Sequence, residues 1–299
     1  MKRAVLAILL LLAVFLVALA GWVFFRPEDP NDPVVNGERM SFWISQLGSE
    51  DAHTRAFAAE NVGSVGPRGP REAAIPALMR LLEDPIPQVR RSAARALPRV
   101  APDGDRARKA LPVLLEALQD PDENVRFDTA RMLGGLLRSG DKEAVAPLGQ
   151  ALTDRSLRVR HEVVELLGRI GSAAEETVPA LVEMLEQQSL RPSVIEVLGR
   201  IGPRAKDAVP ALVAALKEGP PVDIKKHTEI SPGFGKGVVH KSVRMRAVIA
   251  LGQIGPEAKD ALPALIEAYR DENESFRQHV AAAITAIDPA TAKKLRLQL

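Results

Sequence analysis

The sequence predicts an all-α protein: an α-solenoid of about seven helical hairpins, preceded by one N-terminal transmembrane helix. Three observations lead to this prediction. A proline motif recurs along the chain, an amphipathic helical pattern follows each copy in a fixed frame, and a long uncharged apolar stretch stands at the N-terminus. Aromatic residues make up 4% of the chain and hydrophobic residues 46%. Such a core of Ala, Leu, Val and Ile suits packed helices better than a β-sandwich.

The first repeated motif is Pro-Ala-Leu, which marks the beginning of one helix in each hairpin. Full copies and close variants begin at Pro76, Pro112, Pro147, Pro179, Pro210 and Pro263. The successive spacings are 36, 35, 32, 31 and 53 residues. A proline early in a helix costs little, because the first N–H groups of a helix have no partner within it. The motif therefore predicts a first helix, helix A, in each repeat.

The second motif is an amphipathic helix, helix B, written in one frame seven times. With Val89 as position zero, apolar residues recur at positions +4, +7, +8 and +11, which is one face of a helix. Position zero is occupied in turn by Thr54, Val89, Val125, Val159, Leu190, Val243 and Phe276. In the first copy Asn61 is a polar exception. Several copies close with Gly-x-x-Gly, and the second glycine suits a helix C-terminus.

Charged residues mark the same frame. The residue after position zero is arginine in every copy: Arg55, Arg90, Arg126, Arg160, Arg191, Arg244 and Arg277. An acid often stands five residues before position zero, as Asp84, Asp120, Asp154 and Asp271 do.

This combination resembles HEAT repeats, and more narrowly the bacterial HEAT-like repeats first associated with phycobilin lyases. The resemblance covers roughly residues 37–288. It implies a right-handed solenoid whose B helices line the concave face, and we assign residues 37–299 to that domain. It also implies that an Asp–Arg ladder joins neighbouring repeats, so the seven arginines are expected to be structural.

Residues 1–25 predict a signal anchor. Lys2 and Arg3 precede an uncharged run from Ala4 to Phe25. As a helix this run would span about 33 Å, enough to cross a bilayer core. Residues 26–36, rich in Pro and Asp, are expected to form an extended linker. The positive-inside rule then predicts a single-pass membrane protein with its C-terminal domain extracytoplasmic, periplasmic if bacterial. Cleavage near Ala20 would instead give a secreted protein.

Composition excludes several functions. The chain has no cysteine, so disulfides, cysteine-ligated zinc and thiol catalysis are ruled out. Lys and Arg number 40 against 38 Asp and Glu, and the excess of two precedes the apolar run. The rest of the chain is balanced, which does not favour a nucleic-acid partner.

The expected binding surface lies on helix B at positions +2 and +6, which are farthest from the core-facing positions. Along the repeats these positions predict a groove that runs from basic through acidic to apolar. The candidate binding residues are Arg91, Arg95, Arg131, His161, Glu165, Glu196, Met245 and Ile249. We expect this groove to bind an extended segment of another protein. An ordinary solvated face without a partner is the alternative.

A second candidate is an insertion at residues 219–240, which accounts for the 53-residue spacing. It falls between helices A and B of repeat six, where long loops are either functional or mobile. A binding flap and a mobile excursion both remain open. Its candidate contact residues are Lys225, Lys226, His227, Phe234 and Lys236.

No catalytic residue, metal or cofactor is predicted. His161-Glu162 resembles the His-Glu motif of deoxyhypusine hydroxylase, a HEAT-repeat enzyme whose di-iron site needs several such pairs. The matching positions in the other repeats hold no His-Glu pair, so a di-iron site would be incomplete. The expected function is a non-catalytic protein–protein interaction scaffold, held to the membrane by its N-terminal helix. The alternative is an enzyme or accessory subunit, lyase-like or metal-dependent, that uses the 219–240 loop.

Overall fold

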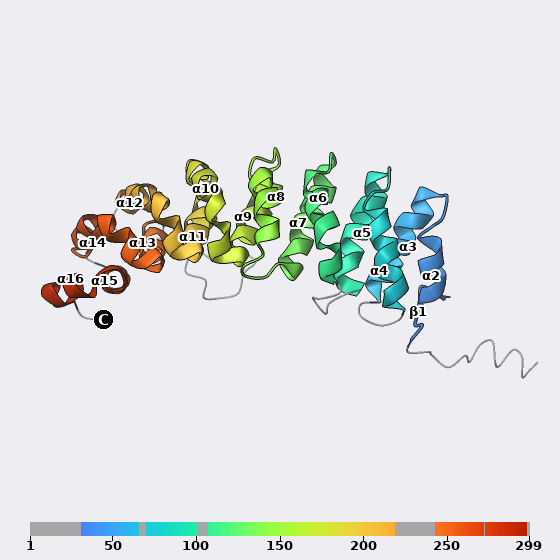
Figure 1. Cartoon of the computed structure of the whole chain (residues 1–299), viewed down its shortest axis with the longest axis horizontal. Coiled ribbons are helices and arrows are strands. Elements are labelled where there is room, and N and C mark those ends of the chain that lie inside the picture. Colours follow the sequence, from blue (N-terminus) through green and yellow to red (C-terminus); the bar gives the residue numbers. More distant parts are fainter. Residues whose placement is uncertain (1–30, 66–69, 101–106, 219–242, 272, 298–299) are drawn as a thin grey trace, which may run out of the picture. The chain divides into compact units, whose positions relative to one another are not determined.

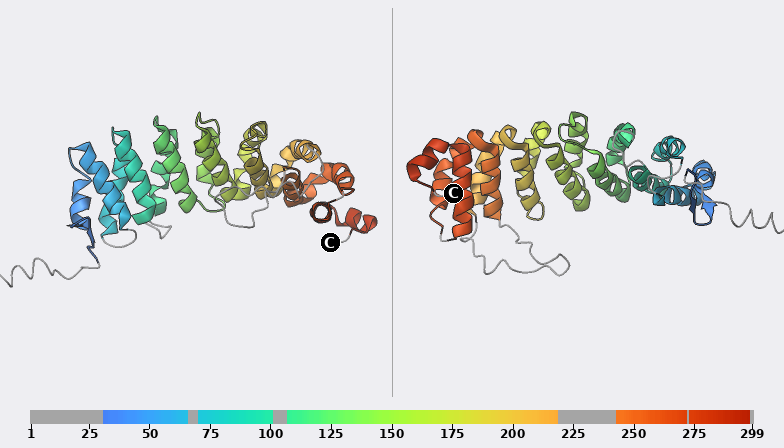
Figure 2. Two further views of the ribbon diagram at one scale, coloured as in Figure 1. Left: turned by 180° about the vertical axis from the view of Figure 1, so that it is seen from behind. Right: turned by 90° about the horizontal axis from the view of Figure 1, so that it is seen from below.

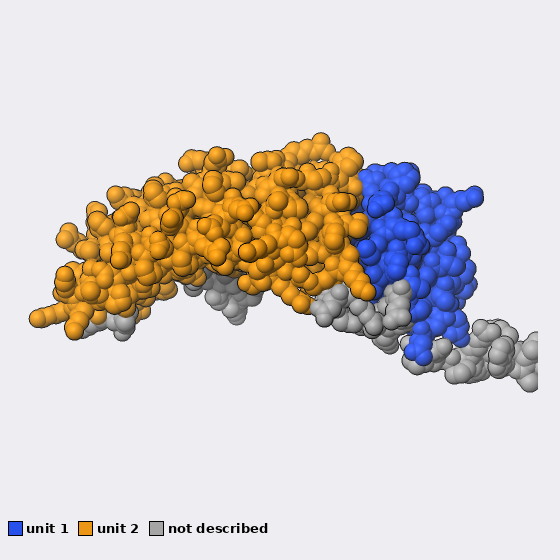
Figure 3. All heavy atoms as spheres, in the orientation of Figure 1, with its two compact units in different colours: residues 1–102 blue, residues 103–299 orange. Residues whose placement is uncertain are grey.

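The computed structural model describes residues 31–65, 70–100, 107–218, 243–271 and 273–297. The chain divides into two compact units, residues 1–102 and residues 103–299 (Figure 3). Each unit is described by itself below. Apart from one β-hairpin whose two strands have two residues each, every regular element in these described ranges is a helix.

Unit 1 contains a short hairpin and two helix pairs. Its elements are β1 (Val34–Val35), β2 (Glu38–Arg39), α2 (Met40–Gln46), α3 (Ala52–Ser64), α4 (Arg71–Leu81) and α5 (Pro87–Val100). Helix α2 packs on α3, α4 packs on α5, and α3 packs along α5 (Figure 1). Alternate helices therefore form two layers, with the A helices α2 and α4 in one and the B helices α3 and α5 in the other.

Unit 2 repeats this arrangement. Its helix pairs are α6 (Leu111–Glu116) with α7 (Glu123–Leu136), α8 (Val145–Ala151) with α9 (Leu157–Ile170), α10 (Val178–Met184) with α11 (Arg191–Ile201), α12 (Val209–Lys217) with α13 (Val243–Ile254), and α14 (Leu262–Ala268) with α15 (Glu274–Ile287). A closing helix, α16 (Pro289–Leu295), packs on α15. The B helices α7, α9, α11, α13 and α15 contact one another in chain order (Figure 2).

Short 3-10 helices flank the A helices of unit 2. They are η1 (Ala107–Ala110), η2 (Ala117–Gln119), η3 (Lys142–Ala144), η4 (Gly171–Thr177), η5 (Gly202–Ala208) and η6 (Gly255–Ala261). In four of these A helices the motif proline occupies one of the first two positions, as predicted. Pro76 differs, since it lies inside α4.

The predicted repeat frame is confirmed. In α9 the four apolar positions, Val163, Leu166, Leu167 and Ile170, are at most 2% exposed. Burying a side chain of this size stabilises the fold by about 1.5–3 kcal/mol, so this face drives the stacking. The closing glycines Gly171, Gly202 and Gly255 have φ of +67°, +73° and +70°, which explains glycine at these helix ends.

The first glycine of the Gly-x-x-Gly pattern has a separate role that the sequence did not reveal. It stands at position +9 and faces position +7 of the next helix B. A Cβ on Gly168 would lie 2.9 Å from Val197 Cγ2, and one on Gly199 would lie 2.9 Å from Ala250 Cα. Glycine therefore lets neighbouring B helices approach closely.

The predicted extended linker differs from the structure over residues 32–36. The carboxylate of Asp32 accepts a hydrogen bond from the Ser41 amide at 2.8 Å. The Trp43 indole N–H donates to the Val35 carbonyl at 2.8 Å. Asn36 contacts the side chain of Asn61, the polar exception in the first frame, which is 2% exposed. These contacts tie the hairpin to the first repeat.

The expected membrane localisation is corrected by the structure. Among the described ranges, no helix has both the length and the apolar character needed to cross a bilayer. The structure therefore does not support the predicted single-pass membrane protein with an extracytoplasmic domain. The predicted transmembrane helix, residues 1–25, lies outside the described residues.

Candidate functional site

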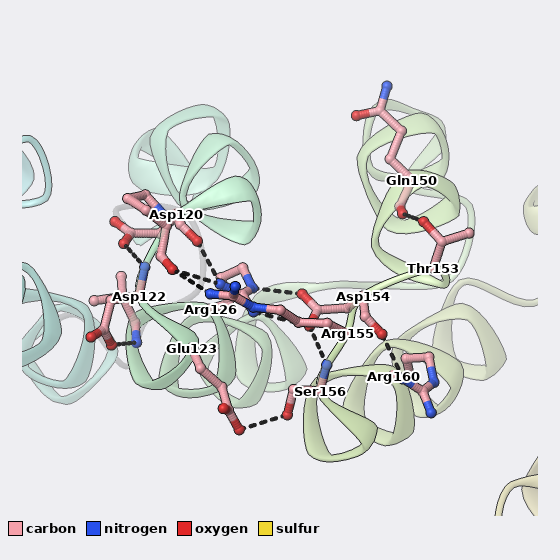
Figure 4. Close-up of polar contacts among 12 residues, drawn as sticks. Asp120, Asp122, Glu123, Arg126, Gln150, Thr153, Asp154, Arg155, Ser156 and Arg160 are labelled. Atoms are coloured by element: carbon pink, nitrogen blue, oxygen red, sulfur yellow. Dashed lines mark hydrogen bonds and ion pairs between the residues drawn. The ribbon is translucent and has the colours of Figure 1, made fainter.

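The arginines after position zero hold neighbouring repeats in register. Arg126 Nε and Nη2 donate to the carboxylate of Asp154 at 2.6 and 3.0 Å, and Arg126 Nη1 donates to the Asp120 carbonyl at 2.7 Å (Figure 4). The side chains of Arg126 and Asp154 are both 7% exposed. Equivalent pairs join Arg55 to Asp84 at 2.7 Å and Arg244 to Asp271 at 3.2 Å. The Asp–Arg ladder implied by the resemblance is confirmed at these three places.

Electrostatics identifies these pairs as structural. Burial disfavours the charged form of Asp154, but hydrogen bonds from Arg126 and from the Ser156 amide outweigh it and lower its pKa. The hydrogen bond to Asp154 raises the pKa of Arg126 in return. Both groups therefore stay charged and paired near neutral pH, which fits a register device rather than a catalytic acid or base.

The ladder lacks a rung between repeats four and five. Arg160 Nη1 donates to the Asp154 carbonyl at 2.6 Å, but its Nε is buried without a hydrogen-bond partner in the part of the chain that the structure describes. Gln187 occupies the place of the missing acid. Its amide donates to the last carbonyl of α10 at 3.0 Å, just as the Asp154 amide donates to the last carbonyl of α8 at 3.1 Å.

The predicted acidic part of the groove is paired with arginines. Glu165 lies 3.7 Å from Arg200, and Glu196 forms an ion pair with Arg246. In each pair the arginine comes from the next repeat. Arg200 and Arg246 stand at positions +10 and +3, which the sequence reasoning did not consider. This stretch is therefore close to neutral, unlike the predicted acidic surface.

The structure brings two predicted residues of the groove together. Glu196 and Ile249 line one pocket of about 180 Å³, together with Arg200, Arg246, Ala250 and Gln253. It lies on helices α11 and α13, within unit 2. An apolar wall beside two ion-paired arginines suits one small side chain of a bound segment.

A basic cluster on helices α7 and α9 is the most distinctive feature of the helix-B surface. The guanidinium carbon of Arg158 lies 3.9 Å from the centroid of the Phe127 ring, and that of Arg131 lies 5.7 Å from it. Both arginines are exposed, and neither forms a salt bridge with an acid in the described ranges. We call these residues the Arg131–Phe127–Arg158 cluster. Only Arg131 was predicted, although Phe127 stands at position +2 and was open to the same reasoning.

The remaining candidate residues are placed as follows. Arg95 is exposed and Arg91 half-buried on α5 of unit 1. His161 is exposed on α9. Met245 is only 8% exposed, which corrects its expected presentation to a partner. The loop candidates Lys225, Lys226, His227, Phe234 and Lys236 lie outside the described residues.

Two further cavities lie beside A helices. A cavity of about 460 Å³ between α6 and α8 has an apolar wall formed by Leu111, Pro112, Leu115 and Pro147. Another, of about 590 Å³, adjoins Lys217 and Arg244, the residues near the two flanks of the insertion. Both have the size of small-ligand sites. The sequence reasoning missed them because it assigned the A helices no binding role.

Metal chemistry finds no ready site in what the structure describes. No group of three or more His, Asp and Glu side chains in these ranges lies close enough to hold a metal ion. The residues of the insertion lie outside those ranges.

Comparisons with known proteins give the following. A family model described as HEAT repeats matches residues 40–115, 111–192 and 239–296. A crystal structure of an engineered protein from a structural genomics consortium has 22% identity and a TM-score of 0.50, over 85% of this chain and 80% of that chain. That likeness shows the helical repeat fold. No curated protein sequence matches the chain.

Two other solved structures are similar at a lower level. The complex of CpcE and CpcF of phycocyanin lyase from Nostoc sp. has 25% identity and a TM-score of 0.45, over 91% of this chain and 98% of that one. A designed armadillo repeat protein in complex with the peptide (KR)4 has 20% identity and a TM-score of 0.45, over 83% of this chain and 99% of that one. These scores carry no functional argument.

Proposed function

Because the chain belongs to the HEAT-repeat family, we propose that it is a non-catalytic scaffold whose helix-B surface binds a segment of another protein. The segment carries carboxylates beside an apolar residue. The observation that supports this most directly is the Arg131–Phe127–Arg158 cluster. The concave shape of that surface and the right-handed superhelix stay predictions.

The cluster differs from three other arginines of unit 2. Arg126, Arg200 and Arg246 are already bound to acids of a neighbouring repeat. Arg131 and Arg158 instead lie against an aromatic ring with their charges toward solvent. A guanidinium held on a ring loses little freedom when it binds a carboxylate in a two-pronged geometry. Arginines and aromatic rings also dominate the energetics of protein interfaces.

Neighbouring residues extend the proposed site. His161 is exposed on α9, close in sequence to Arg158. Farther along, the pocket beside Glu196 and Ile249 offers a place for an apolar side chain. In unit 1, taken by itself, Arg91 and Arg95 on α5 stay binding candidates.

The enzyme alternative keeps one supporting observation. The cavity of about 590 Å³ adjoins both flanks of residues 219–240 and is lined by Arg244, Glu267 and Asp271 among others. A lyase-like or metal-dependent activity that uses the insertion would place its ligand there. Stoichiometric pigment or metal on the purified full chain would favour this alternative.

The scaffold proposal is tested with a defined probe. The full chain is titrated into a fluorescent peptide of alternating Glu and Leu, and into a matched Lys-Leu peptide, and anisotropy is measured. We expect the acidic peptide to bind and the basic one to bind far more weakly. The double variant Arg131→Glu, Arg158→Glu should weaken binding at least tenfold, which corresponds to about 1.4 kcal/mol.

A matched double charge reversal provides the control. Arg80 on α4 and Arg204 on η5 are exposed and lie outside the B helices, so Arg80→Glu with Arg204→Glu changes the net charge equally. Binding should be retained in this variant apart from a small change in long-range attraction. Equal losses in both double variants would reduce the effect to net charge and contradict the assigned site.

A further inference from the structure

Position +3 of helix B faces the preceding repeat. In unit 1 the hydroxyl of Ser92 donates to Glu60 of the preceding repeat at 3.2 Å. In unit 2 Arg246 pairs with Glu196 of its preceding repeat. Each of these contacts runs from position +3 to position +6. In the first repeat, position +3 is Phe57, which is 44% exposed.

Phe57 belongs to an exposed aromatic cluster. Its ring lies 5.4 Å from Trp43 in an edge-to-face arrangement and stacks on His53 at 6.5 Å. Phe42 lies 5.1 Å from Trp43 and is 41% exposed, and Val34 in β1 is 52% exposed. Terminal repeats of solenoids usually present a polar outer face, so an apolar patch here indicates an interface. We call Val34, Phe42, His53 and Phe57 the first-repeat face.

The surroundings of this face are acidic. Glu50 and Asp51 are exposed and stand close to His53 in the sequence, whereas Glu38 pairs with Val35 and not with Val34 across the hairpin. The two arginines of the same repeat differ in their contacts. Arg55 binds the carboxylate of Asp84 at 2.7 Å, whereas Arg39 pairs with Val34 across the hairpin and donates to the Asp32 carbonyl at 3.2 Å. The first-repeat face therefore combines an apolar centre with negative charge.

The last helix has the opposite character. On α16, Lys293 and Lys294 are exposed, and so is Arg296 just beyond it. Leu295 stands among them and is 42% exposed. No acid occurs from Pro289 to Leu297. This helix therefore offers an apolar residue surrounded by positive charge, which complements the first-repeat face.

We propose that the first-repeat face binds α16 of a second copy of this chain, so that copies associate head to tail. Leu295 packs against Phe42 and Phe57, and the basic residues face the acids around them. Two first-repeat faces meeting head to head would instead bring their acids together, which is unfavourable. A head-to-tail contact is heterologous, so it builds rings or filaments rather than a two-fold dimer.

Cysteine crosslinking tests this geometry cleanly, because the chain has no cysteine of its own. Full-length Ser45→Cys places a thiol on α2, and full-length Ala290→Cys places one on α16. Both sites are exposed. Treating a mixture of the two with a short bis-maleimide should give a dimer linked from position 45 to position 290. Neither variant alone should form such a dimer.

Sedimentation velocity over a range of concentrations supplies the second test. Leu295→Ser and the pair Lys293→Glu, Lys294→Glu should each abolish association, and so should Phe42→Ser with Phe57→Ser. Ile86, at 43% exposed, matches Leu295 but lies on neither surface, so Ile86→Ser should associate like the wild type. Mixing a variant defective at α16 with one defective at the first-repeat face should restore a 1:1 complex. Association should also weaken with added salt.

Three results would overturn the proposal. Dimers linked from position 45 to position 45 would show that two first-repeat faces meet each other. A full chain that stays a single copy at all concentrations would exclude a second copy as the occupant. In a full chain that carries Ser45→Cys together with a second cysteine placed in residues 1–25, a bis-maleimide link within one chain would show that its own N-terminal segment covers the face.

Discussion

Two neighbouring junctions of unit 2 hold their repeats together by different means. At the junction of repeats three and four, Arg126 forms an ion pair with Asp154, and the hydroxyl of Ser156 donates to Glu123 at 2.7 Å. The two B helices at this junction, α7 and α9, do not approach each other closely at position +9. A Cβ on Gly134, at position +9, would lie 3.7 Å from Leu166, which is ordinary contact.

At the junction of repeats four and five, the ion pair is missing and the B helices pack closely instead. Gln187 stands in the place of the ladder acid, and Arg160 Nε is buried without a hydrogen-bond partner among the described residues. Gly168, the counterpart of Gly134, brings its helix so close that an added Cβ would lie 2.9 Å from Val197. Close packing is therefore present at this junction without a buried ion pair, although Gly63 packs as closely on Ala96 at the junction that Arg55 and Asp84 join. The comparison teaches that the ladder fixes register but is not required at every junction, in keeping with the small net stabilisation from buried ion pairs.

The largest expected effect comes from breaking the rung at the first junction. Asp154→Ala leaves Arg126 buried without its acid, and we expect the free energy of unfolding to fall by about 3 kcal/mol. Denaturant titration followed by circular dichroism measures it. Glu175 pairs with Arg204 at 2.9 Å in an exposed setting, and Glu175→Ala should cost less than about 1 kcal/mol. Equal costs for the two variants would remove the special role of the ladder.

The next effect comes from the second junction. Gly168→Ala should destabilise the protein by about 1–3 kcal/mol, because the added methyl group has no room beside Val197. Gly134→Ala sits at the same position one repeat earlier, where the methyl group fits. It should be neutral or stabilising by about 0.5–1 kcal/mol, since alanine is the better helix former. Similar behaviour of the two variants in thermal unfolding would contradict the contrast between the junctions.

A smaller gain should follow from completing the ladder. Gln187→Asp gives Arg160 the carboxylate that Asp154 gives Arg126, and we expect a stabilisation of about 1 kcal/mol. Gln187→Asn shortens the side chain without adding charge and is the matched control. If the aspartate variant is no more stable than the asparagine variant in denaturant titration, Arg160 does not reach this position.

The smallest effect is the pH dependence of the rung. The folded-state pKa of Asp154 is lowered, so its contribution to stability is present above the ordinary aspartate pKa of about 3.9. That contribution is lost as the pH falls through the lowered folded-state pKa. The stability difference between wild type and Asp154→Asn should therefore shrink below about pH 4. A difference that persists unchanged in strong acid would show that it does not arise from ionisation.

Much of the fold could be predicted because its signal is repeated. The frame anchored at Val89 recurs with apolar positions and an arginine in register, and each copy reinforces the others. The ladder arginines followed from the same frame and the family resemblance. The glycine at position +9, as in Gly168, was visible but uninterpreted, because its role depends on how closely two helices approach.

The binding surface was less predictable for a physical reason. Positions +2 and +6 describe one helix, whereas the pairs of Glu165 with Arg200 and Glu196 with Arg246 depend on the offset between two helices. Met245 stands at a nominally outer position and is nevertheless buried. The missing rung was also not predicted, because the turn before α11 places Gln187, and not the residue five before position zero, where the ladder acid stands in other repeats. Contacts between repeats depend on how neighbouring helices are offset in three dimensions, whereas the faces of a single helix can be predicted from the periodicity of its sequence.

The most direct test of the scaffold is site-specific photocrosslinking in the full chain. In one variant a photoreactive residue replaces His161, which is exposed and stands three residues after Arg158 of the cluster. In a second variant it replaces Glu176, which is exposed on η4. The account predicts that one protein crosslinks through position 161, that position 176 does not capture it, and that Arg131→Glu with Arg158→Glu abolishes the product. An identical set of products from both positions, unchanged by the charge reversal, would contradict a binding site on the helix-B surface.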